Sequence, residues 1–204
     1  MSLAIMPCTG VVFYTWDETQ TSLEVGLTQH REGGYGLTFG GKINVGAALG
    51  MNVGQTLPLT EDLYEEGEEE LDSRMLHEAI PLSTFQAYAQ PINISLIRVE
   101  DKNPDILVHA SAYYAYPVSW QEKLMLANLP ETTERTGQIL WTKLRWRGNL
   151  NSAAERATNI TLNHDSHDIS WSVFKHRHEQ ECVLQTMAVL ASQKRLWNDR
   201  HKKR

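Results

Sequence analysis

Cysteine is scarce in this sequence, since Cys8 and Cys182 are the only two among 204 residues. They form no CxxC pair of the kind that binds metals, and two cysteines cannot build a framework of several disulfides. Secreted domains that depend on such a framework are therefore excluded, and reduced thiols are the simplest state. We expect a cytoplasmic protein that folds around an ordinary hydrophobic core.

Long hydrophobic runs are also missing. The sequence contains no stretch of about 18 apolar residues, which is roughly the length that a membrane-spanning helix needs. Residues 1–6 have neither the basic segment nor the long apolar segment of a secretion signal. We therefore expect no membrane partner.

A surplus of positive charge is missing as well. The formal net charge is −6 at pH 7, whereas a domain that binds nucleic acid is usually basic. This balance argues against nucleic acid as a partner, although it does not exclude a local basic patch. The motifs GxGxxG, GxxxxGK[ST] and GxSxG do not occur either, so the nucleotide-binding and serine-hydrolase sites that depend on them are not expected.

Strand-like and helix-like segments follow one another irregularly along the chain. Residues 10–16 are β-branched and aromatic, and residues 22–27 alternate apolar with polar side chains, which together predict an antiparallel hairpin. Further strands are predicted at residues 92–99, 106–118 and 138–144, and a long C-terminal helix at residues 178–197. The order indicates an α/β (α+β) fold in one domain, residues 1–204, whose mixed sheet is flanked by helices.

An acidic helix is predicted at residues 61–77. Thr60 is suited to cap its N-terminus. Leu63, Leu71 and Met75 are separated by multiples of four residues, so they share one helical stripe that can pack on the sheet. Gly67 lies on the same stripe and is a weak point inside the helix.

Two pieces of sequence resemble the signature of the Nudix hydrolases. Gly40, Gly41 and Lys42 follow a predicted strand, like the turn that opens the family's box. The glutamates of residues 65–70 lie in a helix, where the box has its R-E-x-x-E-E pattern. The resemblance implies a Nudix-like mixed β-sheet sandwiched between helices. It also implies a hydrolase that needs Mg²⁺ or Mn²⁺ and cleaves a nucleoside diphosphate linked to another moiety.

The resemblance assigns candidate site residues. If Thr60 caps the helix, the first box glutamate of the helix is Glu66 and the following pair is Glu69 and Glu70. Acids at positions i, i+3 and i+4 lie on one helical face, and magnesium prefers such oxygen ligands. Glu66 and Glu69 are the candidate catalytic residues. The candidate metal ligands are the carbonyl of Gly41 and the side chains of Glu65, Glu66, Glu69 and Glu70; a competing register uses Asp62, Glu65 and Glu66.

The chain departs from the family's box at several positions. Ala47 falls where the box has its first glutamate, and Glu65 falls where the helix has its arginine. That arginine can pair with and orient the acids, so its loss loosens the site. These departures favour a second hypothesis, a catalytically impaired module that binds a ligand or regulates a partner.

Three other groups of residues are candidates for function. The segment 163–168, with His176 and His178 behind it, is rich in potential metal ligands, but its spacing matches no strong motif and indicates a surface loop. In residues 141–146, Lys143 and Arg145 stand between two tryptophans, an arrangement that can stack on a base and hold a phosphate. Trp197 is a candidate contact in a homodimer, because aromatic residues are enriched at interfaces.

Overall fold

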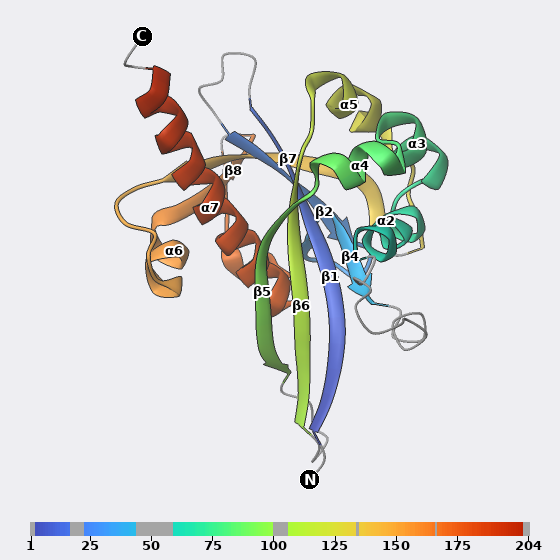
Figure 1. The fold of residues 1–204 in the computed structure, drawn as a ribbon, viewed down its shortest axis with the longest axis horizontal. Coiled ribbons are helices and arrows are strands. Elements are labelled where there is room, and N and C mark those ends of the chain that lie inside the picture. Colours follow the sequence, from blue (N-terminus) through green and yellow to red (C-terminus); the bar gives the residue numbers. More distant parts are fainter. Residues whose placement is uncertain are drawn as a thin grey trace.

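The computed structural model describes residues 3–16, 23–43, 59–99, 106–133, 135–165 and 167–201. Within these ranges, side chains 3–6, 93–99, 106–109, 137, 153, 177–178 and 194–201 lie outside the description. The described residues form a nine-stranded sheet with helices on both faces (Figure 1). Its strands are β1 (Leu3–Trp16), β2 (Leu23–His30), β3 (Tyr35–Gly36), β4 (Phe39–Lys42), β5 (Gln90–Val99), β6 (Ile106–Pro117), β7 (Arg135–Trp146), β8 (Ile160–His164) and β9 (His167–Ile169).

The sheet is mixed, as the sequence predicts. Its strands run in the order β5-β6-β1-β2-β7-β8-β9, while β3 pairs with β2 and β4 pairs with β1. The long pairing of β1 with β6 is parallel, and every other strand pair described is antiparallel. Strand β1 therefore lies at the centre, between β6 and β2, and also supports β4. The predicted mixed α/β fold is confirmed.

Two hydrophobic cores lie on opposite faces of this sheet. Successive side chains of a strand point to opposite faces, and β1 obeys this rule: Val11 and Phe13 enter one core, whereas Val12 and Tyr14 enter the other. The first core is covered by α2 (Leu59–Glu70), α3 (Ser73–Ala79), α4 (Leu82–Tyr88) and α5 (Trp120–Met125). The second core is covered by α7 (Arg177–His201), with α6 (Ala153–Asn159) beside it (Figure 1).

The predicted acidic helix is two helices in the structure. Its break falls between α2 and α3, because the side chain of Asp72 accepts a hydrogen bond from Met75 N and caps a new helix. Gly67 lies inside α2 and does not end it, since the missing side chain lets the helix approach Phe39 and Leu76. The predicted stripe does face the sheet: Leu63 and Leu71 are buried and Met75 packs beside them.

The C-terminal half holds more sheet than the sequence indicates. In the segment 163–168, predicted as a loop, Asn163 and His164 belong to β8, and His167 and Asp168 belong to β9. Strand β7 begins at Arg135, three residues before its predicted start. Leu184, Met187 and Leu190 of α7 lie in the second core. The side chain of Trp197 lies outside the described residues, so its proposed dimer contact stays a prediction.

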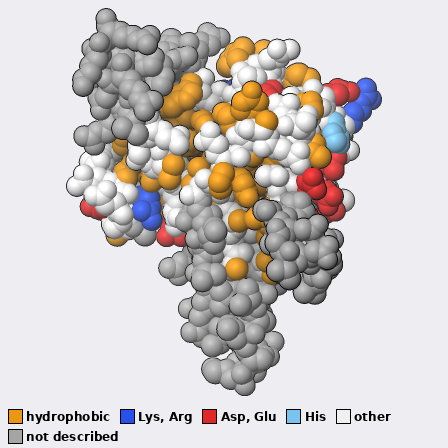
Figure 2. All heavy atoms as spheres, viewed as in Figure 1, with side chains coloured by type: hydrophobic (Ala, Val, Ile, Leu, Met, Phe, Trp, Pro, Cys, Tyr) orange, Lys and Arg blue, Asp and Glu red, His pale blue; other side chains and the backbone are white. Residues whose placement is uncertain are grey.

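The described surface separates an apolar area from an acidic one. Exposed apolar side chains gather over α4 and α5, where Tyr88, Trp120 and Leu124 are the most exposed, and acidic side chains gather over α2 (Figure 2). None of the described helices is both long enough and apolar enough to cross a membrane.

The aromatic contacts around Phe85 generate a test of the core. Phe85 is fully buried and its ring stacks on that of Tyr116. Replacing a buried phenylalanine by alanine removes apolar burial and leaves a cavity, so Phe85→Ala should lower the free energy of unfolding by about 3–5 kcal/mol. Tyr88→Ala, on the exposed side of the same helix, should change it by less than about 1 kcal/mol. Urea denaturation measures both; equal effects would contradict this packing.

Candidate active site

The acidic face of α2 lies against the glycines of β4. Glycine at position 41 lets the helix side chain lie against the strand, because a Cβ atom built there would overlap the carboxylate of Glu66 and force it to move. The backbone of β4 is held in place by antiparallel pairing with β1, in which Gly41 faces Thr9. Leu63 and Tyr64, one turn earlier in α2, are buried and press the helix onto the sheet. The half-buried Glu66 thus sits directly on the strand that carries the two glycines.

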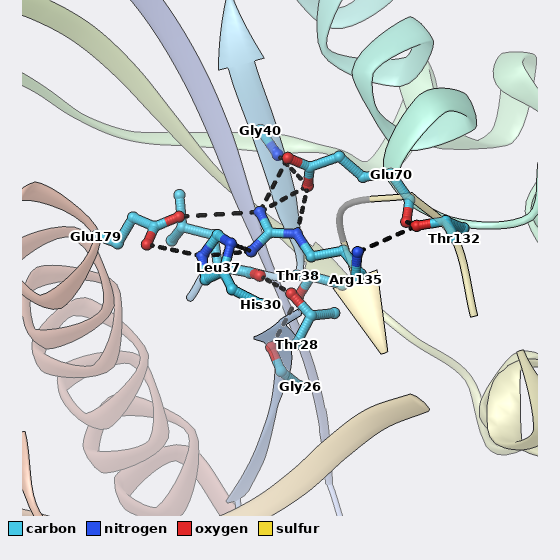
Figure 3. A network of polar contacts seen from close by, with 10 residues as sticks. All are labelled: Gly26, Thr28, His30, Leu37, Thr38, Gly40, Glu70, Thr132, Arg135 and Glu179. Carbon is cyan, nitrogen blue, oxygen red and sulfur yellow. Dashed lines mark hydrogen bonds and ion pairs between the residues drawn. The ribbon is translucent and has the colours of Figure 1, made fainter. Parts of the chain in front are cut away.

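Glu70 is fixed by a buried arginine from another strand. Arg135, the first residue of β7, is 1% exposed and Glu70 is 5% exposed. Arg135 Nη2 donates to both carboxylate oxygens of Glu70, at 2.9 and 2.8 Å, and Nε donates to one of them at 3.1 Å (Figure 3). Gly40 N–H donates to the same carboxylate at 3.3 Å. Such a forked, charge-assisted contact holds both partners in one geometry.

A threonine ties the end of α2 to the start of β7. Thr132 Oγ1 donates to the backbone carbonyl of Glu70 at 2.8 Å and accepts from Arg135 N at 3.2 Å (Figure 3). The last turn of α2 would otherwise leave carbonyl groups without partners. Glu70 is therefore anchored through its main chain as well as its side chain.

The guanidinium of Arg135 continues the network to the C-terminal helix. Its Nη1 contacts the imidazole of His30 on β2. His30 Nε2 lies 3.3 Å from Glu179 Oε2 on α7, and Arg135 Nη2 lies 3.9 Å from the other oxygen of Glu179. Position 36 must be glycine here, because a Cβ atom would crowd His30, Glu179 and Arg135. The buried Arg135 thus contacts two buried carboxylates on opposite sides of the sheet, those of Glu70 and Glu179.

The two carboxylates differ in pKa. Burial raises the pKa of Glu70 to about 7, and the nearby Glu179 adds to the rise, although Arg135 and the Gly40 N–H oppose it. Burial acts in the same direction on Glu179, but the hydrogen bond with His30 and the charges of His30 and Arg135 outweigh it and lower the pKa of Glu179. Of the two carboxylates, Glu70 is therefore the one that takes up a proton more readily.

A second set of potential metal ligands lies at the far end of this network. Ligand atoms of His30, His176 and Glu179 lie within 4.8 Å of one another, with His176 exposed and the other two buried. Burial lowers the pKa of His176, which favours its neutral, metal-binding form. However, His30 and Glu179 already contact Arg135, whose positive charge opposes a cation there. His164 and His167, also candidate ligands, lie apart from this set in the β8–β9 hairpin.

The candidate site residues differ in how deeply they are buried and in which residues they contact. Glu66 is half-buried beside Gly41, whereas Glu65 and Glu69 are exposed on the outer side of α2. Asp62, from the competing register, is half-buried one turn before Glu66. Glu70 is buried and held by Arg135. Ala47 lies outside the described residues.

Sequence analysis missed three members of the network, namely His30, Arg135 and Glu179. They come from β2, β7 and α7, and no local motif surrounds any of them. Arg135 lies three residues before the predicted strand. A charged residue in such a segment is normally solvent-exposed, so Arg135 gave no signal of burial. The pairing appears only when the fold brings the end of α2 beside β7.

Comparison with known proteins supports the fold. No family model matches the sequence, and no curated protein matches it. Among solved structures, a MutT/nudix family protein from Enterococcus faecalis is similar over 88% of this chain and 60% of its own, with a TM-score of 0.51 and 14% sequence identity. At that identity the likeness shows the fold alone. The chain therefore has a Nudix-type fold, as the resemblance of its sequence implies.

The buried pair generates a stability test. Arg135→Met leaves Glu70 buried without its main partner, which should cost about 3–5 kcal/mol of unfolding free energy. The double variant Arg135→Met/Glu70→Gln removes the stranded charge and should recover a substantial part of that loss. Arg74→Met is a matched control, because Arg74 is exposed on α3 and bonds only to Glu78 among its described contacts. Denaturant titration measures all three. Additive losses in the double variant would show that the two side chains are not coupled.

The raised pKa of Glu70 generates a pH test. A carboxyl group with a folded pKa near 7 and an unfolded value of about 4.3 favours the folded state below the unfolded pKa, and this contribution is lost as pH rises through 7. Relative to Glu70→Gln, the wild type should therefore lose about 3 kcal/mol between pH 4.5 and 7.5, since one pKa unit corresponds to about 1.4 kcal/mol. Urea titrations across this range measure the difference. A difference that grows in favour of the wild type with rising pH would contradict the assignment.

Proposed function

We propose that this chain is a divalent-metal-dependent phosphoanhydride hydrolase of the Nudix type. Its substrate class is a nucleoside diphosphate linked to another moiety. The observation that carries the proposal is the placement of Glu66 against Gly41, on a helix that follows the glycine strand in a Nudix-type fold. This is the placement that the sequence resemblance implies for a metal-binding acid.

The residues at this point suit magnesium or manganese. The available donors are carboxylate oxygens of Glu66, Glu69 and Glu65 and the backbone carbonyl of Gly41, and hard divalent cations prefer oxygen ligands. Glycine at position 41 leaves room for the carboxylate beside the main chain. Like charges at this spacing repel one another along the helix. A bound cation would offset that repulsion.

The glutamates of α2 would have two roles in the reaction, as metal ligands and as the general base. Glu66 would be the central ligand, because its carboxylate lies against Gly41, and the exposed Glu65 and Glu69 of the same helix would add ligands from the solvent side. One of these exposed glutamates, free to reach solvent, accepts the proton of the attacking water. A bound cation supplies charge neutralisation on the diphosphate and activation of that water. The phosphoanhydride bond then breaks, water adds across it, and a nucleoside monophosphate and the phosphorylated other moiety are both released.

Arg135 acts as a positioning residue in this proposal. The acidic helix lacks the arginine that the family's box carries, and Glu65 stands in its place. Strand β7 brings a guanidinium to the same helix from outside, through the forked contact with Glu70. Glu70 is one turn after Glu66, so fixing Glu70 also fixes the rotation of α2 that turns Glu66 toward Gly41. A ligand role for Glu70 stays a prediction, because its oxygens are engaged by Arg135 and Gly40.

The proposal is tested by turnover. With magnesium and a panel of nucleoside diphosphates linked to sugars, nucleosides or other groups, the wild type should release a nucleoside monophosphate from at least one substrate. Glu66→Gln should lower kcat by at least about 100-fold, because the amide cannot replace a charged metal ligand. Glu78→Gln, an exposed glutamate on α3 that pairs with Arg74, should keep wild-type activity. No turnover of any substrate would contradict the proposal.

The engagement of Glu70 by Arg135 favours one alternative, a module that binds a metal or nucleotide without cleaving it. Magnesium separates the possibilities when no turnover is found. A protein that binds the ion is stabilised by it, so a rise in melting temperature that Glu66→Gln and Glu69→Gln abolish indicates the binding module. No rise in the wild type would exclude a magnesium site altogether.

A further inference from the structure

Three basic side chains line up at the end of β7, far along the chain from Glu70. Lys143, Arg145 and Arg147 are all exposed. Alternate residues of a strand point to the same face, and Ile139 and Trp141 of this series pack against the core under α2–α5. The ladder continues past β7, since Arg147 N donates to Asn159 O. We call Lys143, Arg145 and Arg147 the basic strip.

The basic strip does not stabilise the described fold through ion pairs or side-chain hydrogen bonds. Within the part of the chain that the structure describes, none of its three side chains has an ion pair or a side-chain hydrogen bond. Among the other exposed cations of the described residues, Arg31, Arg74 and Lys175 each pair with a glutamate, at 3.0, 3.0 and 2.9 Å, whereas Lys42 has no ion pair. The strip differs from Lys42 in that three cations within five residues have no ion pair in the described part of a chain whose net charge is −6.

The face that carries the strip is open and polar. Strand β8 lies beside it, with Thr161 opposite Arg145 and Asn163 opposite Lys143. Arg145, Arg147, Thr161 and Asn159 line a hollow of about 390 Å³. One acid, Asp168, also lines it, and its carboxylate accepts a hydrogen bond from Asn163. The strip therefore keeps a positive charge and has the hydroxyl of Thr161 beside it, while the amides of Asn159 and Asn163 donate to Asn149 O and Asp168.

The spacing of the strip fits a chain of phosphates. Side chains two residues apart on a strand are separated by about 6.7 Å, a separation that successive phosphates of an extended single strand also reach. The three cations therefore match three consecutive phosphates. Trp146 packs partly into the opposite core but also lines the hollow between Arg145 and Arg147, and stacking of a base on such a ring does not depend on the sequence. Lys123 lies over the ring of Trp141 at 4.9 Å.

We propose that the basic strip binds the phosphate backbone of single-stranded nucleic acid without reading its sequence. The inference goes beyond the proposed hydrolase and does not depend on it, because it needs neither a metal nor turnover. It also revises the expectation of no nucleic-acid partner, which followed from net charge alone. Because each phosphate that the strip neutralises releases counterions, the affinity falls as the salt concentration rises. Asp168 and the overall negative charge oppose the contact, so we expect the binding to be weak.

Fluorescence anisotropy with labelled oligothymidine and oligouridine, in the presence of EDTA, tests the strip. Three neutralised phosphates predict a slope of log K against log salt of about −2 for a single strand, so affinity should fall about 20-fold between 50 and 200 mM salt. The double variant Arg145→Glu/Arg147→Glu should abolish binding. The milder Arg145→Gln should reduce the slope to about −1.4. Circular dichroism of each variant confirms that it is folded.

A matched control removes the effect of net charge. Arg31→Glu/Arg74→Glu changes the charge by the same amount at exposed positions away from the strip, and it should bind like the wild type. Equal loss in both double variants would overturn the proposal, as would no binding or binding without a salt slope. Displacement by equimolar inorganic phosphate would show a simple anion site instead. Binding to vesicles containing phosphatidylserine, lost in the strip variant and without any binding of oligonucleotide, would assign the surface to membranes and also overturn it.

Discussion

The buried contact between Arg135 and Glu70 is the constraint on which the proposed active site depends. A buried charge needs a partner, so β7 and α2 must meet at one point for either side chain to be buried. That meeting fixes the rotation of α2, and the rotation places Glu66 on Gly41. The same arginine reaches His30 and Glu179, so the C-terminal helix is tied to the acidic helix across the sheet.

The broad fold follows from sequence because local signals are strong where strands are long. Alternating or β-branched segments predict β1, β2, β5, β6 and β7, and their irregular order with helices predicts a mixed sheet. The boundaries of the helices and strands are predicted less well from the sequence. Asp72 interrupts the acidic helix because its side chain caps a new one, and a capping residue inside an acidic run looks like any other acid. The sequence did not predict the β8–β9 hairpin, because its polar residues lie on an open face of the sheet and look like those of a loop.

The candidate site was predictable only in its local part. The glycine pair and the glutamates are close in sequence, so a motif can show them together. Arg135 is 65 residues from Glu70, and Glu179 is 149 residues from His30. Contacts over such separations exist only in the folded chain, and one sequence does not show them. The loss of the arginine from the helix predicted a looser site, whereas the fold brings a guanidinium to Glu70 from β7.

The position of a bound cation tests the central claim most directly. Crystals grown with Mn²⁺ and measured at a wavelength where manganese scatters anomalously show where the ion binds. The arrangement described here predicts an anomalous peak between the carboxylate of Glu66 and the main chain of Gly41, with Arg135 still bound to Glu70. An absent peak at that position, or a peak at His30, His176 and Glu179 instead, would contradict it.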